Sequence, residues 1–397
     1  MQRHTEQQLM REPVRRMPRG PVLDWSSFQV VDAPGICSIE NLPHRMFTTS
    51  GRAAIYQALL QLQLPAASPV LLPTYHCPTM VAPVILAHLQ PVYYGVRPDA
   101  LPDLNAIDAA TAGKARAMIV PHYFGLAQSL AEVRAWCDQR GIALIEDCAH
   151  CYFGEAGERA AGAWGDFATA SLSKFLPVPE AGLLASAHRP LIKPVLQRAS
   201  AKAQIKGGVD VLELAARYQR LAGLQGALNL LFRLKNARHH ESFAGDASLA
   251  PATAETMMRD CDMARIAQRP LAASMALKAM LPRGRIIAVR QRNFAIYAQR
   301  LQGLDGARLL RPLPTEPVAP YVFPLWVEDA DRVYHALRTQ NFPVFRWDRI
   351  WPGTPSLPGD VGPEWSRHVL QLLCHQDLSE ADVVRTAEAV QRLLAHP

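Results

Sequence analysis

The 397-residue chain lacks an apolar run long enough to span a bilayer, and its first twenty residues contain no apolar core or small-residue cleavage site. The sequence therefore predicts neither a membrane-spanning helix nor a secretory signal peptide. Its seven cysteines are odd in number and scattered along the chain. This pattern favours free thiols in a reducing compartment over a disulfide framework, so we expect a cytoplasmic protein.

The sequence also lacks a basic stripe interleaved with aromatic residues, so its net charge of +7 does not predict a nucleic-acid partner. Substrates that carry phosphate would suit that charge equally well. No internal repeat or low-complexity tract is present. What remains is an ordinary globular composition, with 49% hydrophobic and 19% charged residues, over a length that favours more than one domain.

Short apolar runs alternate with helical patterns from about residue 48 to 187, which is typical of strand–helix–strand units on a parallel sheet. We expect strands over 70–72, 92–94, 117–120, 142–145, 167–173 and 182–187. The run over 142–145 is continuously apolar, as a strand buried on both faces requires. We expect helices over 52–62, 80–89 and 130–140. At the start of the third helix, Ser129 and Glu132 have capping-box spacing.

Long helical patterns replace this alternation between about 190 and 255, including one from Val209 to Leu234 with a basic end. Such a helix can lie on a membrane surface, but we favour packing on the protein itself or on a partner subunit. Further helices are expected over 257–281, 286–301, 330–340 and 379–394, with strands over 321–327 and near 344. These last elements indicate a smaller α+β domain.

We therefore divide the chain into three parts. Residues 1–24 form a basic N-terminal arm, and residues 25–255 form a large domain that carries a helical insertion at 190–255. Residues 256–397 form the small C-terminal domain.

Lys174 closes the segment Ser171-Leu172-Ser173-Lys174, at the end of an apolar run. A partly desolvated lysine amine loses some of its preference for the charged form, so it can condense with a carbonyl as a Schiff base. Asp147 directly follows a buried strand, at the sheet edge where α/β proteins bind ligands. An aspartate there can keep a pyridine nitrogen protonated, and the Ser171 hydroxyl can bind phosphate. Together these residues predict a pyridoxal 5'-phosphate (PLP) site.

The start of the first expected helix is a second candidate for binding phosphate. Its sequence is Thr49-Ser50-Gly51-Arg52. A helix N-terminus offers unpaired N–H groups and the positive end of the helix dipole, and Gly51 lets the backbone approach an anion closely. A simple N-cap by Ser50 or Thr49 explains the same residues when they are taken alone. Their combination with Lys174 and Asp147 favours the phosphate.

Three motifs, in this order, resemble the DegT/DnrJ/StrS family of nucleotide-sugar aminotransferases. They are Ser50-Gly51-Arg52-Ala53-Ala54, Glu146-Asp147-Cys148-Ala149-His150, and Gly165-Asp166-Phe167 leading to Ser171-Leu172-Ser173-Lys174. The resemblance covers about residues 45–190 and returns more faintly after 285. It implies a PLP-dependent transferase of fold type I. In that α/β fold, helices flank a mostly parallel seven-stranded sheet, and a smaller α+β domain follows.

The resemblance also implies an aminotransferase that works in polysaccharide or secondary-metabolite biosynthesis. Its donor would be glutamate or a similar amino acid, its acceptor a keto sugar nucleotide, and its active form a homodimer with sites near the subunit interface. Relatives with histidine in place of the lysine are dehydratases, and Lys174 argues against that branch. The implied contacts are a Schiff base at Lys174, a ring-nitrogen contact from Asp147, a cofactor-edge contact from His150, and phosphate contacts from Gly51, Arg52 and Ser171.

The chain departs from the family's pattern at four places. Arg52 stands where threonine is usual, and an aromatic residue that stacks on the cofactor ring is replaced by Cys77, with Tyr75 and His76 beside it. The asparagine-and-arginine motif, which in relatives reaches the neighbouring subunit's site, is represented by Asp262–Arg265. The late leucine-proline motif is Leu373-Cys374-His375. Because of these changes, the resemblance indicates the identity of the cofactor more clearly than the identity of the amino-group acceptor.

Alternative functions remain open at this level. The same fold hosts PLP enzymes that catalyse elimination or carbon–carbon bond formation, and a non-catalytic relative would act as a binding module. Cys148 and Cys151 have the spacing of a redox pair, although small side chains lining a cofactor pocket explain them as well. No second cysteine pair is near, so we expect no metal site. His239 and His240 lie in a charged segment and are expected to face solvent.

Overall fold

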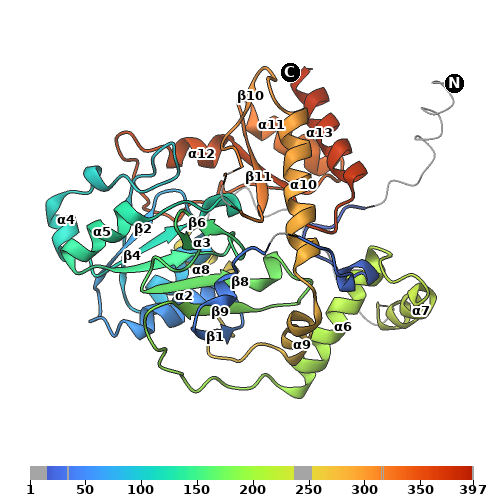
Figure 1. Ribbon diagram of the computed structural model, residues 1–397, viewed down its shortest axis with the longest axis horizontal. Helices are drawn as coiled ribbons and strands as arrows, with labels where there is room; N and C mark the ends of the chain where they lie inside the picture. Colours follow the sequence, from blue (N-terminus) through green and yellow to red (C-terminus); the bar gives the residue numbers. More distant parts are fainter. Residues whose placement is uncertain (1–15, 34, 237–252, 314, 316, 396–397) are drawn as a thin grey trace.

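The computed structural model describes residues 16–33, 35–236, 253–313, 315 and 317–395, which Figure 1 shows as ribbons. The largest element is a seven-stranded sheet in the order β1-β9-β8-β5-β4-β2-β3. Its strands are β1 (His44–Thr48), β2 (Pro69–Pro73), β3 (Gln90–Tyr94), β4 (Ala117–Pro121), β5 (Ala143–Asp147), β8 (Phe167–Ser171) and β9 (Gly182–Ser186). Only β9 runs antiparallel to its neighbours, β1 and β8. The mostly parallel seven-stranded sheet is therefore confirmed.

Both faces of this sheet are buried, which explains its continuous apolar runs. In β4, Ala117 and Ile119 belong to the core under α2 (Gly51–Gln61) and α3 (Pro78–Leu86). Met118 and Val120 belong to the core on the opposite face, which includes residues of α5 (Ala131–Arg140). Loops at the carboxyl ends of the parallel strands are left free to build a site.

A second sheet of four antiparallel strands follows, in the order β10-β11-β13-β12. Its strands are β10 (Ala307–Leu309), β11 (Val322–Val327), β12 (Val344–Phe345) and β13 (Val369–Leu373), and its helices are α11 (Ala330–Thr339), α12 (Gly362–His368) and α13 (Glu380–Ala395). These elements share a separate hydrophobic core. The smaller α+β unit was predicted, whereas β10, β13 and α12 were missed.

Helix α10 (Gly284–Arg300) joins the two units, as Figure 1 shows. Near its start, Ile286 and Ile287 pack into the core of the large sheet. About two to three turns later, Phe294 and Tyr297 pack into the core of the small sheet. A single helix therefore fixes the small sheet relative to the large one.

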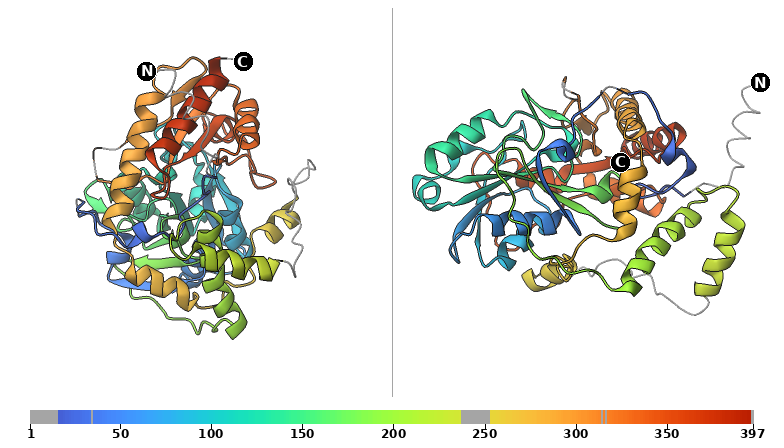
Figure 2. Two further views of the ribbon diagram at one scale, coloured as in Figure 1. Left: turned by 90° about the vertical axis from the view of Figure 1, so that its right-hand side faces the viewer. Right: turned by 60° about the horizontal axis from the view of Figure 1, so that its bottom comes forward.

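The helices between the two sheets differ from the expected ones. Instead of one helix over 209–234, the chain forms α6 (Ala201–Arg217) and α7 (Gln225–Asn236), because Gln219 and Gly223 adopt positive φ angles of 55° and 86°. Instead of one helix over 257–281, it forms α8 (Ala254–Asp260) and α9 (Ala272–Met280). Pro270 cannot continue a helix, and Asp262 has a φ of 46°. Figure 2 shows α6 and α7 as a pair at the periphery of the molecule.

Smaller corrections concern the helix starts and the termini. The expected capping box of α5 is absent: the N-cap residue is Leu130, and the Ser129 hydroxyl accepts only from the Ala131 N–H, at 3.3 Å. Residues 1–15 of the predicted arm and His239–His240 lie outside the described residues. Met17, which belongs to the arm, is buried against the small unit. The domain boundary near residue 255 stays a prediction. No helix in the described ranges is long and apolar enough to cross a bilayer.

The remaining short elements connect these layers. They are α4 (Ala109–Lys114), β6 (Glu155–Ala156), β7 (Arg159–Ala160), and five single-turn 3-10 helices, η1 (Trp25–Phe28), η2 (Ile39–Asn41), η3 (Leu104–Ala106), η4 (Tyr123–Gly125) and η5 (Leu172–Lys174).

Candidate active site

The six predicted site residues line one cavity of about 610 Å³. They are Gly51, Arg52, Asp147, His150, Ser171 and Lys174. The cavity opens at the carboxyl ends of β5 and β8 and at the N-terminus of α2, and Tyr321, Phe345 and Trp347 of the small unit form its other side. It therefore lies where the parallel sheet meets the small sheet.

Lys174 reaches the cavity because β8 ends at Ser171 and the single turn η5 carries the chain three residues further. Its amine lies 5.2 Å from the centre of the Tyr321 ring. Burial lowers the pKa of this amine below its ordinary value, while Cys77 and Asp147 act in the opposite direction. A larger share of the amine is therefore unprotonated, which is the form that attacks a carbonyl.

Asp147 is the last residue of β5 and is buried. Its Oδ1 atom accepts hydrogen bonds from the Ala149 N–H at 2.9 Å and from the Thr169 hydroxyl at 3.5 Å. Burial raises the pKa of this carboxyl, and the charge of Lys174 opposes that shift. A cationic ring nitrogen at this carboxylate would favour its ionised form further.

The other end of the cavity is the N-terminus of α2. The Ser50 hydroxyl caps the helix by accepting from the Ala53 N–H at 3.2 Å, so this side chain is an N-cap. Gly51 and Arg52 are in the first turn, whose N–H groups have no partner within the helix. A Cβ on Gly51 would lie 3.3 Å from the Ser171 Cβ, which is tighter than ordinary contact. The absence of a side chain keeps the helix end close to Ser171.

His150 is buried and stacks on the Tyr321 ring, with 4.3 Å between the ring centres and 30° between the planes. Burial, and to a smaller extent the charge of Lys174, lower the pKa of His150 well below its ordinary value of 6.5. The imidazole is therefore neutral at physiological pH. A neutral ring can lie against an aromatic cofactor without the cost of burying charge.

The family's stacking aromatic residue is replaced by Cys77, with Tyr75 and His76 beside it. Of these three residues, only Cys77 lines the cavity. Tyr75 is buried in a cluster of aromatic rings, 5.2 Å from Trp347. His76 is held between the Pro73 carbonyl, 2.8 Å from its Nδ1 atom, and the Trp351 N–H, 3.1 Å from its Nε2 atom. Among Tyr75, His76 and Cys77, Cys77 alone is therefore placed to face a ligand in the cavity.

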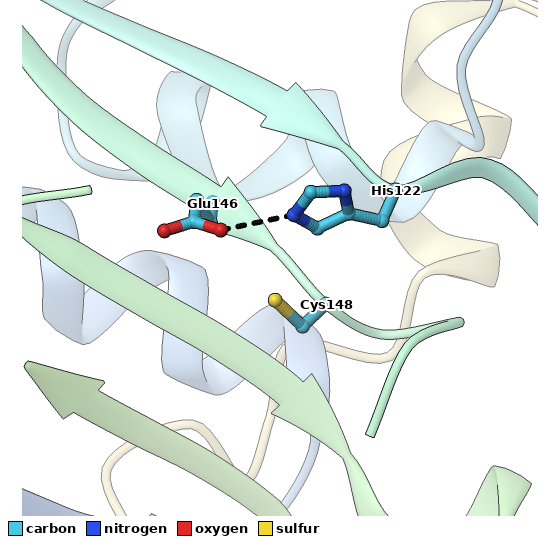
Figure 3. Close-up of side chains that lie close together, drawn as sticks. All are labelled: His122, Glu146 and Cys148. Carbon is cyan, nitrogen blue, oxygen red and sulfur yellow. Dashed lines mark hydrogen bonds and ion pairs between the residues drawn. The ribbon is translucent and has the colours of Figure 1, made fainter. Parts of the chain in front are cut away.

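Glu146, His122 and Cys148 lie within reach of one another, as Figure 3 shows, and their atoms could hold a metal ion. The Glu146 carboxylate is already occupied. It accepts from the His122 Nε2 atom at 2.9 Å and from three backbone N–H groups, those of Gly162, Trp164 and Gly165. Burial raises the pKa of the Cys148 thiol well above 9 and that of Cys151 to about 12. We therefore interpret the cluster as a hydrogen-bond network, and neutral thiols disfavour the redox alternative.

Sequence reasoning missed Arg290, a fully buried residue of α10. Its guanidinium donates to the Lys174 carbonyl at 2.7 Å, to the Pro320 carbonyl at 3.1 Å and to Gln376 Oε1 at 3.1 Å. It also lies 4.4 Å from the centre of the Phe175 ring. Burial lowers the pKa of Arg290 to about 10, so the side chain stays charged at neutral pH. Arg290 thus holds the backbone that carries Lys174.

Other missed residues are His122, Gln371, Tyr321 and Trp347. In the described part of the chain, His122 Nδ1 and Gln371 Oε1 are buried without a hydrogen-bond partner, and both residues line the cavity. Buried polar atoms without partners are uncommon, so these two atoms indicate a ligand that completes them. No local signal marks these residues, because chain segments far from the three motifs carry them into the cavity.

The cavity fits PLP in the chemistry of its side chains. It combines an amine with a lowered pKa, a buried carboxylate, and a helix N-terminus beside a serine, which match an aldehyde, a ring nitrogen and a phosphate. The unpartnered His122 and Gln371 atoms supply further polar contacts.

Comparison with curated proteins gives partial matches. The chain is 30% identical over 160 residues to an L-glutamine:2-deoxy-scyllo-inosose aminotransferase of Streptomyces kanamyceticus, which covers 40% of this chain and 36% of the relative. It is 23% identical over 367 residues to a dTDP-4-dehydro-2,3,6-trideoxy-D-glucose 4-aminotransferase of Saccharopolyspora spinosa, covering 88% and 84% of the two chains. The first relatives are matched over only 32% to 40% of their own length.

Comparison with solved structures bears on the fold. The chain superposes on Helicobacter pylori PseC, an aminotransferase involved in pseudaminic acid biosynthesis, with a TM-score of 0.63, 12% identity, and coverage of 96% of this chain and 99% of that one. At this identity the likeness establishes fold type I alone. Residues 36–198, which include all six predicted site residues, match the DegT/DnrJ/EryC1/StrS aminotransferase family. In this part of the chain the sequence is therefore similar to that aminotransferase family.

Proposed function

We propose that the protein is a PLP-dependent aminotransferase that moves an amino group from an amino acid to a keto sugar nucleotide or a similar keto substrate. Such reactions serve the biosynthesis of polysaccharides or secondary metabolites. One observation carries the proposal. The Lys174 amine and the Asp147 carboxylate face a single cavity whose far end is a helix N-terminus beside Ser171.

We assign the binding contacts as follows. PLP would supply an aldehyde that lysine captures and a ring that accepts electrons. Asp147 would hold the ring nitrogen, and His150 would lie against the cofactor's edge. The phosphate would be bound by the first-turn N–H groups of Gly51 and Arg52 and by the Ser171 hydroxyl.

Lys174 has two tasks in this proposal. Its Nζ atom anchors the cofactor, and when the amino donor releases it, the same atom takes the proton from the donor's α carbon. Burial keeps part of the amine unprotonated and therefore able to accept that proton. Tyr321 lies over the amine and limits its access to water. Arg290 keeps the Lys174 backbone in place through the whole cycle.

The names of the relatives support keto sugars as acceptors. One relative is named for 2-deoxy-scyllo-inosose with L-glutamine as the donor, and another for a dTDP-linked dehydro sugar. For this chain we propose glutamate or glutamine as the donor. Elimination and carbon–carbon bond formation are not favoured by these names, and neither is a binding module.

We also propose a cytoplasmic homodimer. The seven cysteines are all free, which fits a reducing compartment. Exposed apolar side chains gather on α6 and α7, where Ile205 is 70%, Leu230 63% and Leu231 55% exposed. Burying such a surface against a second copy would be favourable.

The test is a single half-reaction. Purified protein is loaded with PLP, mixed with L-glutamate or L-glutamine, and analysed by chromatography for pyridoxamine 5'-phosphate and the matching keto acid. The proposal predicts stoichiometric formation of both products by the wild type and none by the Lys174→Ala variant. No conversion with any common amino donor would contradict transamination.

A further inference from the structure

The N-terminal segment carries a charged side chain to the edge of the active site. Residues 16–23 run along the small unit, and Arg19 of this segment lines a second cavity of about 80 Å³. This cavity borders the larger one, because both are lined by Ser173, Lys174, Tyr321 and Phe345. We infer that Arg19 binds the α-carboxylate of the amino donor. The inference rests on the proposed function and adds to it a residue that recognises the donor.

Hydrogen bonds fix the backbone on both sides of Arg19. The buried His375 side chain donates from its Nε2 atom to the Pro18 carbonyl at 3.0 Å. After Arg19, the Val22 N–H donates to the buried Asp377 carboxylate at 3.0 Å. The position of Arg19 is therefore set before a ligand binds, which lowers the entropic cost of binding.

The Arg19 side chain is exposed and available to an anion. The arginines that line the larger cavity already pair with carboxylates of the chain, as Arg52–Asp262, Arg265–Glu180 and Arg346–Asp331. Among the described residues, no carboxylate lies within ion-pair distance of Arg19, whose Cζ atom is 5.7 Å from the centre of the Phe345 ring. Arginine stacks readily on aromatic faces, and this contact leaves its N–H groups free to donate.

The size of the small cavity selects the kind of anion. The proposed reaction brings three kinds to the site: the PLP phosphate, the carboxylates of the donor and the diphosphate of the acceptor. The volume of about 80 Å³ is the room of roughly two to three water molecules, since each occupies about 30 Å³ in the liquid. A carboxylate has this size, whereas a nucleoside diphosphate is much larger. The PLP phosphate is already assigned to the N-terminus of α2.

The chemistry of the donor requires a carboxylate beside Lys174. The α-carboxylate is bonded to the carbon whose proton Lys174 takes in the proposed reaction, so it must lie close to the Lys174 amine. The small cavity meets this condition, because Lys174 and Arg19 both line it. A carboxylate there can accept two parallel N–H···O bonds from the planar guanidinium, which is a strong and directional pair. The distal carboxylate of glutamate lies further from the reacting carbon.

The first measurement is binding without turnover. The α-methyl analogue of the donor that the wild type uses, 2-methyl-L-glutamate or 2-methyl-L-glutamine, has no α proton to lose. Its binding is followed by the absorbance of lysine-bound PLP. Arg19→Met should raise its dissociation constant by about 10- to 100-fold, the size expected when a hydrogen bond to a charged group is lost. An unchanged dissociation constant would overturn the inference.

Two controls separate recognition of the donor from damage to the fold. Arg16→Met changes an exposed arginine of the same segment that does not line the small cavity, so this variant should bind the analogue as the wild type does. The affinity for PLP should be unchanged in both variants, because Arg19 is assigned to the donor alone. An equal loss of PLP affinity and donor affinity in Arg19→Met would show a general distortion of the site and contradict the inference.

A donor without the α-carboxylate tests which carboxylate is bound. 4-Aminobutyrate is glutamate without this group, and it keeps the distal carboxylate. At low donor concentration, Arg19→Met should slow the half-reaction of L-glutamate by about 10- to 100-fold and leave that of 4-aminobutyrate as slow as in the wild type. An equal loss with both donors would assign Arg19 to the distal carboxylate and overturn the inference.

The diphosphate of the acceptor is tested with dTDP as a competitor of the half-reaction. We expect Arg19→Met and the wild type to bind dTDP equally. If Arg19→Met weakens the binding of dTDP and leaves that of the donor analogue unchanged, Arg19 serves the acceptor and the inference is wrong.

The proposed function fails by a different readout. If the wild type forms no pyridoxamine 5'-phosphate with any amino donor, the proposed function is wrong and the inference falls with it. If the wild type converts its donor and Arg19→Met binds the donor analogue equally tightly, only the inference is wrong.

Discussion

The environment of the Lys174 amine is expected to lower the stability of the folded protein. Its amine is removed from water, and Cys77 and Asp147 restore only part of the lost preference for charge. Asp147 has the complementary problem, since burial raises the pKa of its carboxyl. Burial therefore disfavours the charged form of both groups as long as no ligand is bound. Sites of this kind commonly lower the stability of the protein in exchange for function.

We expect Lys174→Met to be more stable than the unliganded wild type at neutral pH. Between the lowered pKa of the folded state and the ordinary value of 10.5, the unfolded wild type binds more protons than the folded one. Wild-type stability therefore rises with pH through this window, and methionine removes that dependence. Urea unfolding at pH 7, 8.5 and 10 measures the unfolding free energy of both proteins. The advantage of Lys174→Met over the unliganded wild type should shrink as pH rises. An advantage that stays constant or grows would contradict a buried amine with a lowered pKa.

Asp147→Asn tests the carboxylate separately. The amide can keep the hydrogen bond from the Ala149 N–H but cannot hold a ring nitrogen cationic. We expect lysine-bound PLP to form, while the rate of the glutamate half-reaction falls by about 10²- to 10³-fold, as when a preorganised charge contact is lost. Thr169→Val is the control, because its hydroxyl is 3.5 Å from the carboxylate and should matter far less. Stopped-flow absorbance measures the rate of the glutamate half-reaction in each protein. Equal rates in the wild type, Asp147→Asn and Thr169→Val would refute the proposed contact between the Asp147 carboxylate and the ring nitrogen.

At the scale of elements, the parts that carry the chemistry were predictable and the connections were not. The continuous run before Asp147 and the motif at Lys174 placed both residues at the edge of one sheet. Strand β1 was missed because its register depends on antiparallel pairing with β9. The single helix expected over 257–281 is wrong because Pro270 interrupts it, and the connecting segment brings Asp262 and Arg265 to the cavity. Tyr321 and Arg290 could not be found, since only tertiary packing brings them to Lys174.

Helix α10 is expected to position Lys174 through Arg290. Its guanidinium bonds carbonyls of two segments, so Arg290→Met leaves the Lys174 and Pro320 carbonyls without this donor. We expect a loss of unfolding free energy of about 1–3 kcal/mol and weaker PLP binding. Arg292→Met in the same helix removes a partly exposed pair with Glu380 at 3.3 Å and two hydrogen bonds to the neighbouring Asn293 Oδ1. It should change the unfolding free energy by about 1 kcal/mol or less.

Denaturant unfolding and PLP titration measure both effects. Arg290→Lys keeps the charge but not the planar set of donors, so partial recovery is expected. If Arg290→Met matches Arg292→Met in both assays, α10 does not position Lys174.

The whole molecule joins two sheets around the cavity and leaves α6 and α7 at its periphery (Figure 2). Neither helix lies within residues 36–198, the part that matches the family. Several of their leucines are exposed. Sequence patterning predicted helical structure here but not the break between the two helices.

The proposed homodimer predicts that this surface controls association. Leu230→Glu combined with Leu231→Glu should lower the dimer's stability, because burying two unpaired carboxylates is unfavourable. Leu60→Glu, at an exposed leucine of α2, is the matched control. Sedimentation velocity over a range of concentrations separates monomer from dimer. An unchanged equilibrium in the double variant would place the interface elsewhere.

In the proposed function, Lys174 carries PLP as a Schiff base. The most direct measurement incubates the protein with PLP, reduces it with borohydride, digests it and locates the added mass by mass spectrometry. If Lys174 carries PLP, one modified peptide is expected, the one containing Lys174, and no mass is fixed there in Lys174→Ala. The added mass on another lysine, or on no lysine, would show that Lys174 does not carry PLP.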